Sequence, residues 1–241
     1  MTLLTRSRFL SCLAAGAMVL ATPAAFAQHY PDRPIKLIVP FAPGGATDIL
    51  GRLLATGLSD KLGQPVIVEN RPGAGTVVAG GLVAKAPPDG YTLFLGASTT
   101  LTHNPAIRAS LPYDPLRSFT PLGLVADMGL VLVANNGTPG KTLQELVALS
   151  KAEPDKFSYG SYGTGFSVHF GGEMLKTATG LKAMHVPFNG SSPSLTALMG
   201  GQVQLAVDTV VATTPLIKAG KIRPIATLGG QRLPLQPDVP T

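Results

Sequence analysis

Short runs of apolar and β-branched residues alternate along the first half of the chain with longer segments that have helical periodicity. The runs at 35–39, 66–68 and 92–95 predict buried strands. The segments between them, 48–62 and 76–85, predict helices, and apolar residues of the first recur on one face. A glycine follows that helix directly, as a left-handed cap requires. This order of strands and helices is typical of a parallel sheet covered on both faces.

The same alternation begins again in the second half. Apolar runs predict strands at 130–134, 157–159, 183–187, 204–208 and 222–227. Helices are expected at 142–151, 167–179, 191–199 and 213–218. The first of these helices opens with Thr142 and Glu145, which have the spacing of a capping box. Two such blocks predict two α/β lobes: lobe I at 28–124, with 225–241 returning to it, and lobe II at 125–224.

Glycine-rich loops follow two of the expected strands. Residues 42–45 come after the first strand of the first block, and residues 160–165 come after the second strand of the second block. Each loop leads into a helix. Glycine lets the backbone approach a ligand, and a helix N-terminus presents free N–H groups to an anion. Because ligands of open α/β sheets bind beyond the carboxyl ends of strands, the loops predict the two sides of one anion-binding cleft.

The first 27 residues have the pattern of an export signal. Arg6 and Arg8 precede an apolar run that ends in Ala25-Phe26-Ala27, so we expect cleavage before Gln28. The alternative is an uncleaved membrane anchor, because the apolar segment is just long enough to span a bilayer.

Composition narrows the class of protein further. Removal of the signal leaves 241 − 27 = 214 residues, and the single cysteine, Cys12, lies within the signal, so no disulfide is expected. The net charge of +6 falls to +6 − 2 = +4 without the two signal arginines. The remaining basic residues are scattered, which argues against nucleic-acid binding. A mildly positive field suits an anionic solute.

Patterns that would indicate a cofactor or catalysis are incomplete. Residues 135–142 resemble a phosphate-binding loop, but Asn135 stands where the first glycine is required. The chain has no Gly-x-Ser-x-Gly elbow, and its four histidines lack the spacing of a metal site. We therefore expect no cofactor, no metal and no catalytic residue. A hydrolase or transferase acting on a small acidic substrate is the alternative.

Several long motifs resemble the Bug-type, TctC-like solute receptors of tripartite tricarboxylate transport systems. The matching segments are 40–45 with Asp48 and Arg52, 68–75, 84–93, 160–165 with His169 and Glu173, 185–190, 200–203, 218–223 and 237–241. They occur in order along nearly the whole mature chain.

This resemblance implies a two-lobed periplasmic-binding-protein architecture, of the Venus flytrap kind. The function that it implies is non-enzymatic capture of a small carboxylate, such as a carboxylic acid, a dicarboxylate, an amino acid or an aromatic acid. It further implies a periplasmic monomer that passes its ligand to the permease subunits of a membrane transporter. Lobe closure on the ligand would stabilise the closed state.

The resemblance also assigns ligand-binding residues. On lobe I these are Phe41, Gly44, Gly45, Thr47, Asp48, Ser98 and Thr99. On lobe II they are Ser161, Gly163, Thr164, Gly165, Ser167 and Asp208. Asp48 has an alternative role, because an acid in the first helical turn stabilises the helix start without touching a ligand.

Two features depart from the family pattern. Phe166 stands where members usually carry a small hydroxyl residue, so we expect Phe166 to line the pocket and to favour a larger or aromatic ligand. The chain also ends at Thr241, whereas relatives continue further. We therefore expect lobe I to lack its C-terminal part, with exposed apolar surface and reduced stability, and a nonfunctional remnant is a further alternative.

Overall fold

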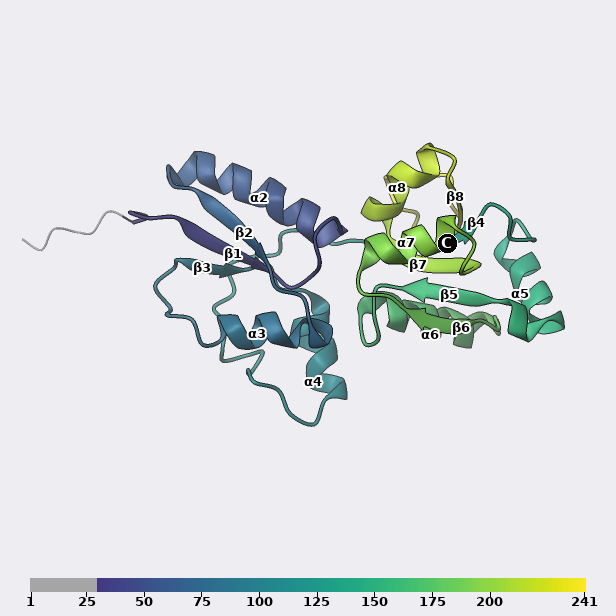
Figure 1. Cartoon of the computed structure of the whole chain (residues 1–241), viewed down its shortest axis with the longest axis horizontal. Coiled ribbons are helices and arrows are strands. Elements are labelled where there is room, and N and C mark those ends of the chain that lie inside the picture. Colours follow the sequence, from purple (N-terminus) through teal and green to yellow (C-terminus); the bar gives the residue numbers. More distant parts are fainter. Residues whose placement is uncertain (1–29) are drawn as a thin grey trace, which may run out of the picture. The chain divides into compact units, whose positions relative to one another are not determined.

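The computed structural model describes residues 30–241, shown in Figure 1. The predicted signal peptide at 1–27 and its cleavage site lie outside the described residues. Arg33–Thr241 forms one compact unit. Within the part that the structure describes, none of the helices combines the length and the apolar character needed to cross a membrane.

The N-terminal sheet is parallel, as predicted. Its strands are β1 (Ile35–Val39), β2 (Val66–Asn70) and β3 (Thr92–Phe94), in the order β2-β1-β3. The connecting helices are α2 (Ala46–Leu62) and α3 (Val77–Val83), which lie on opposite sides of the sheet in Figure 1. The apolar residues of the central strand are buried: Ile35, Leu37 and Val39 pack in one cluster with residues of α2, and α3 contacts the strand as well.

Helix α2 ends where the sequence predicts. Gly63 adopts a left-handed conformation with φ 68°, and its N–H donates to the Ser59 carbonyl at 3.0 Å. Such a cap satisfies a carbonyl that the helix would otherwise leave without a partner.

Two short helical segments after β3 were not predicted. They are η2 (Thr99–His103) and α4 (Asn104–Ile107), and a further short segment, η1 (Ala74–Thr76), precedes α3. Polar side chains hold them together: Asn104 Nδ2 donates to the Gly75 carbonyl at 2.7 Å, and Thr100 Oγ1 donates to Thr76 Oγ1 at 2.8 Å. Because these contacts are polar, the segments carry no apolar periodicity that could reveal them.

The C-terminal sheet is mixed rather than wholly parallel. Its strands are β4 (Leu130–Asn135), β5 (Ser158–Ser161), β6 (Met184–Pro187), β7 (Leu205–Thr209) and β8 (Ile222–Leu228), in the order β6-β5-β7-β4-β8. Strand β5 is parallel to β6 and β7, but β4 is antiparallel to β7 and β8. The expectation of a second parallel sheet is wrong for β4. A buried apolar run looks the same in either orientation, so periodicity could not fix this direction.

Helices cover both faces of this sheet. They are α5 (Leu143–Ala152), α6 (Ser167–Thr179), α7 (Ser191–Met199) and α8 (Val210–Lys218), with a short turn, η3 (Pro154–Lys156), after α5. Leu146 and Val168 belong to one apolar cluster, and Leu195 and Leu198 to another. The predicted capping box is present in part: Thr142 Oγ1 accepts from the Glu145 N–H at 3.2 Å, but the Glu145 carboxylate accepts from the Lys141 N–H at 2.6 Å and not from that of Thr142.

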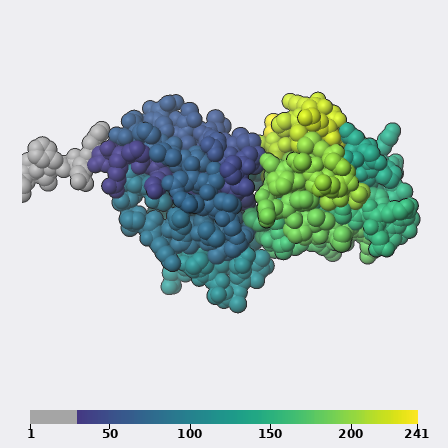
Figure 2. Space-filling model, viewed as in Figure 1, coloured from purple at the N-terminus to yellow at the C-terminus, as the bar shows by residue number. Residues whose placement is uncertain are grey.

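The last residues of the chain pack with the C-terminal sheet. Strand β8 pairs with β4, the Thr227 N–H donates to the Pro240 carbonyl at 2.7 Å, and Val239 joins the cluster that contains Leu198. In Figure 2 these yellow residues lie against the green part of the surface. The expectation that 225–241 return to lobe I is therefore wrong, because Ile225 and Ala226 bury their side chains in the C-terminal sheet.

Candidate functional site

The first loop, residues 40–45, connects β1 to α2. Gly44 has φ 84°, which glycine adopts at little cost. Gly45 is the extended N-cap of α2, and no side chain among the described residues caps this helix. The first backbone N–H groups of the helix therefore remain for another acceptor.

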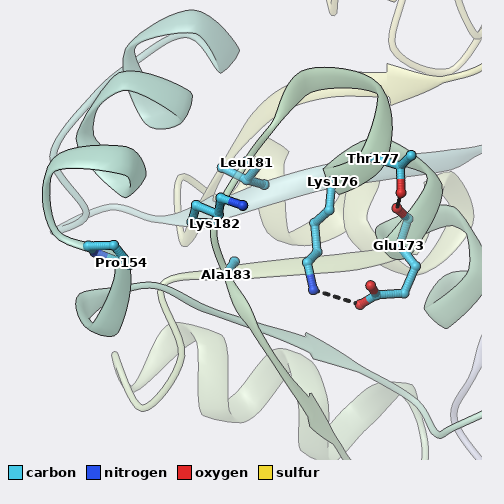
Figure 3. A pocket seen from close by; sticks show the side chains of 7 residues that line it. All are labelled: Pro154, Glu173, Lys176, Thr177, Leu181, Lys182 and Ala183. Atoms are coloured by element: carbon cyan, nitrogen blue, oxygen red, sulfur yellow. Dashed lines mark hydrogen bonds and ion pairs between the residues drawn. The ribbon is translucent and has the colours of Figure 1, made fainter.

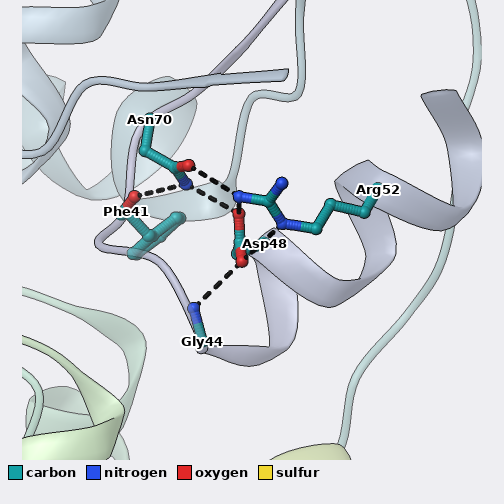
Figure 4. Close-up of polar contacts among 5 residues, drawn as sticks. All are labelled: Phe41, Gly44, Asp48, Arg52 and Asn70. Carbon is teal, nitrogen blue, oxygen red and sulfur yellow. Dashed lines mark hydrogen bonds and ion pairs between the residues drawn. The ribbon is translucent and has the colours of Figure 1, made fainter. Parts of the chain in front are cut away.

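Asp48 ties the first loop to the end of β2, as Figure 4 shows. Its Oδ2 accepts from the Gly44 N–H at 2.9 Å and from Arg52 Nε at 3.0 Å, and its Oδ1 accepts from Asn70 Nδ2 at 2.8 Å. Burial acts to raise the pKa of Asp48, but the hydrogen bonds from Arg52, Gly44 and Asn70 together hold it below its ordinary value. Both carboxylate oxygens are engaged, which favours the helix-start role of Asp48 over ligand contact.

The second loop, residues 162–166, connects β5 to α6. Gly163 and Gly165 have φ 140° and 81°. The Gly163 N–H donates to Ser161 Oγ at 3.2 Å, and the Gly165 N–H donates to His169 Nδ1 at 3.3 Å. Phe166 is the extended N-cap of α6, again without a side-chain cap in the described structure. The two glycine amides are thus engaged within the protein, and the His169 N–H donates to the Phe166 carbonyl at 3.0 Å. The N–H groups of Ser167 and Val168, the first two residues of α6, have no acceptor within the helix.

A stack of rings lies behind the second loop. The His185 ring lies 4.2 Å from that of His169 and 4.9 Å from that of Tyr159, in both cases centroid to centroid, and His185 Nε2 lies 2.7 Å from Ser161 Oγ. Burial, with a smaller effect of the neighbouring His169, lowers the pKa of His185 to about 4. His185 is therefore uncharged at neutral pH.

Contacts join the two loops within the compact unit. The Phe41 ring lies 6.1 Å from the Tyr162 ring and 5.6 Å from the Phe166 ring. Ser98 Oγ, beyond β3, lies 3.2 Å from Ser167 Oγ in the first turn of α6. The structure thus brings together residues that follow β1, β3 and β5. The glycine loops predicted the meeting of the segments after β1 and β5, but gave no signal for the segment after β3.

The N-terminus of α7 lies beside the first loop. A Cβ placed on Gly44 would lie 3.2 Å from Ser192 Oγ, and one on Gly45 would lie 3.8 Å from Ser191 Cβ. The N-cap of α7, Gly190, has φ 125° and no side-chain cap among the described residues. The N-termini of α2 and α7 therefore meet, and the Phe41–Phe166 contact links them to α6.

Asp208 lies behind this helix start. It is fully buried, with Oδ2 accepting from Ser191 Oγ at 2.7 Å and Oδ1 accepting from the Thr209 N–H at 2.7 Å. Burial raises the pKa of Asp208 to about 6. Burial and the charge of Asp208 also raise the pKa of Tyr162 above its ordinary value. Asp208 is thus placed to orient Ser191.

The predicted site residues fall into three groups. Those whose contacts join the N-terminal and C-terminal parts are Phe41, Gly44, Gly45, Ser98, Gly165, Phe166 and Ser167. Ser161 and Gly163 are buried and contact each other behind this meeting point. The others lie around it: Thr47 in the first turn of α2, Thr164 exposed on the second loop, and Thr99, Asp48 and Asp208 buried.

Sequence reasoning missed Tyr162, His185, Ser191 and Ser192. The two serines follow Gly190 at the start of a predicted helix, which is the same signal that revealed the two loops. No comparable signal identifies Tyr162 or His185, because their roles depend on which elements become neighbours.

A separate open pocket of about 400 Å³ lies beside the C-terminal half of α6, as Figure 3 shows. It is lined by Pro154, Glu173, Lys176, Thr177, Leu181, Lys182 and Ala183. Lys176 Nζ pairs with Glu173 Oε1 at 2.9 Å. None of the predicted ligand-binding residues lines this pocket. Across the described part of the chain, no group of three or more His, Cys, Asp or Glu side chains is placed to hold a metal ion.

The family model described as "Tripartite tricarboxylate transporter family receptor" matches residues 50–241. The chain belongs to this family. It is 41% identical over 227 residues to a UPF0065 protein of Bordetella pertussis, covering 93% of this chain and 69% of that protein. It is 39% identical over 216 residues to Protein BugT of the same organism, covering 89% of this chain and 66% of that protein.

Solved structures show the same relationship. The chain matches R. palustris Rpa4515 with adipate at a TM-score of 0.85 and 36% identity, covering 88% of this chain and 71% of that one. It matches MatC from Rhodopseudomonas palustris with bound malate at a TM-score of 0.81 and 35% identity, covering 88% of this chain and 72% of that one. The expected family and the two-lobed α/β fold of periplasmic binding proteins are thereby confirmed. The chain is a solute-binding protein of this family, whose members are periplasmic binding proteins.

Proposed function

We propose that this receptor captures a small carboxylate where the first and second loops meet, and passes it to the permease subunits of a tripartite tricarboxylate transporter. The observation that carries the proposal is the meeting of the N-termini of α2, α6 and α7. Their N-cap residues are Gly45, Phe166 and Gly190, and none of the three helix starts has a side-chain cap within the described residues.

Helix N-termini bind anions for two reasons. Their first N–H groups have no partner in the helix, and the aligned peptide dipoles leave partial positive charge there. Several N-termini directed at one place can therefore satisfy both oxygens of a carboxylate without a charged side chain. The hydroxyl groups of Ser98 and Ser167, which lie 3.2 Å apart, and the hydroxyl group of Ser192, which lies beside Gly44, can donate further hydrogen bonds.

The nearby arginine does not take this role in the structure. Arg52 donates to Asp48 and to Asn70 Oδ1, at 3.0 and 3.2 Å, and so serves the first loop itself. The aromatic rings of Phe41, Tyr162 and Phe166 pack against one another beside the helix starts, and an apolar surface there would strengthen hydrogen bonds to a bound anion.

Binding is coupled to closure in this proposal. A ligand that contacts both loops stabilises the arrangement in which they meet. Dicarboxylates are the first candidates, since the two solved relatives hold adipate and malate. Phe166 adds an apolar surface that favours a longer or aromatic acid.

Calorimetric titration tests the ligand class. We expect saturable binding for one or more of adipate, malate, citrate, aspartate and benzoate, and no binding for adipamide, the uncharged diamide of adipate. Equal binding of adipate and adipamide would refute carboxylate recognition, as would failure of all the acids. Native mass spectrometry of protein from the periplasmic fraction would identify a ligand that co-purifies.

The same material tests the remaining parts of the proposal. Recovery of the bound acid in unchanged form is expected for a receptor, whereas its conversion would favour the enzyme alternative. N-terminal sequencing is expected to begin at Gln28, and light scattering is expected to give the mass of a monomer.

A further inference from the structure

The two loops share one backbone conformation. Gly44 and Gly165 have φ 84° and 81°. Each is followed by an extended helix N-cap: Gly45 with φ −83° and ψ 169°, and Phe166 with φ −84° and ψ 163°. The loops come from different sheets and have different sequences, so this agreement indicates that they are equivalent parts of the two lobes.

The loops are also held in equivalent ways. In each, the glycine N–H donates to a side chain four residues later, which is Asp48 Oδ2 at 2.9 Å in the first loop and His169 Nδ1 at 3.3 Å in the second. In each, a residue of the neighbouring strand then fixes that side chain. Asn70 of β2 donates to Asp48 at 2.8 Å, and His185 of β6 stacks on His169 at 4.2 Å.

His185 also contacts Ser161, the last residue of β5, which directly precedes the second loop. Its Nε2 lies 2.7 Å from Ser161 Oγ, and Ser161 Oγ accepts the Gly163 N–H at 3.2 Å. Gly165 therefore depends on His169 directly, and Gly163 depends on His185 through Ser161. Both glycines have positive φ, so the loop needs such support to keep one shape.

The hydrogen bond from Gly165 fixes the state of His169. Nδ1 can accept this N–H only when it carries no proton, so the neutral ring has its proton on Nε2. An asparagine at this position offers an acceptor at a similar place without the ring. A glutamine at 185 can likewise reach the place of Nε2.

We propose that His169 and His185 are positioning residues for the second loop. They correspond to Asp48 and Asn70, which hold the first loop in the same way. The two histidines keep the Gly163 and Gly165 amides engaged within the protein. The exposed Thr164 and the first turn of α6 are then the groups that meet the ligand. This inference rests on the proposed function of the loop. It identifies Thr164 and the first turn of α6, and not the two glycine amides, as the groups that contact the ligand.

Paired substitutions test the proposal, with adipate and malate as probes in calorimetry. His169→Ala and His185→Ala are expected to weaken binding about tenfold, which is the effect of losing a hydrogen bond that shapes the site. His169→Asn and His185→Gln are expected to restore affinity to within about threefold of the parent. Thr177→Ala, an exposed change on the same helix, is the control. Unchanged affinity in the alanine variants would overturn the proposal, and so would failure of both conservative variants to restore it.

A second readout needs no ligand. Amide NMR of the free protein is expected to show shifted and broadened Gly163 and Gly165 signals in the alanine variants, with recovery in His169→Asn and His185→Gln. If no carboxylate binds the parent protein, the proposed function fails, and the NMR series still decides the positioning roles. Glycine signals that stay unchanged in both alanine variants would refute them.

Discussion

Ser98 Oγ and Ser167 Oγ lie 3.2 Å apart, although 69 positions separate the two residues in the chain. One follows β3 of the N-terminal sheet, and the other opens α6 on the C-terminal sheet. This contact joins the two sheets at the place where we propose that the ligand binds.

Ser167→Ala should therefore weaken binding of the tightest acid found by calorimetry about three- to tenfold, because one hydroxyl donor is lost. Its thermal midpoint should change little, since the hydroxyl lies in the first turn of a helix that apolar contacts hold. Equal affinity of Ser167→Ala and the parent protein would show that this hydroxyl does not contact the ligand.

Phe166→Ser should change ligand preference. The aromatic ring lies 5.6 Å from that of Phe41 and occupies the space that a Cβ on Gly163 would fill. Removing it opens the site and restores a hydroxyl, so affinity should shift from longer or aromatic acids toward malate. A titration panel with benzoate, adipate and malate measures the shift, and an unchanged order of affinities would contradict the assignment.

Gly44→Ala should weaken both stability and binding. Gly44 has φ 84°, and an added Cβ would lie 3.2 Å from Ser192 Oγ. The left-handed conformation alone should cost about 1–2 kcal/mol of unfolding free energy. Gly57→Ala in the exposed middle of α2 is the matched control, because a Cβ there meets no atom within 4 Å. The control should be stabilised by up to about 1 kcal/mol, as denaturant unfolding can show.

Asp208 should make the parent protein less stable as pH rises from about 4 to about 6. Burial raises its pKa from 3.8 to about 6, so the folded state holds the proton more tightly than the unfolded state over this interval. Asp208→Asn should lack this dependence. The measurement is the thermal midpoint of the parent protein minus that of Asp208→Asn, taken at several pH values between about 4 and about 6. A difference that does not change with pH would show that the carboxyl does not titrate in this interval.

His185 should act in the opposite direction over a similar interval. Its pKa is lowered from 6.5 to about 4, so the unfolded state takes up the proton first and stability falls as pH drops from about 6.5 to about 4. His185→Gln should remove that loss. Because the two groups oppose each other, each must be measured against its own variant, and a His185→Gln curve parallel to the parent would disprove the effect.

Local signals in the sequence predicted much of the fold. The bounds of α6 and α7 were predicted at 167–179 and 191–199, where the structure has them, and Gly63 and Gly180 cap helices in the left-handed conformation. These features depend on residues next to one another in the chain. The direction of β4 and the packing of β8 depend on pairing between distant strands, which periodicity does not encode.

The candidate site divides in the same way. Gly44 and Gly165 could be recognised because the positive φ that each adopts favours glycine in any context. His185 could not, because its contact with Ser161 arises only once β6 lies beside β5.

The two glycine turns have a consequence for how such a receptor can diversify. Their shape comes from the main chain and from groups behind it, so in the proposed site the backbone N–H donors stay in place when the facing side chains are exchanged. Under this proposal, receptors for different acids can differ at a few aromatic positions, such as Phe166, while the backbone groups that bind the carboxylate stay the same.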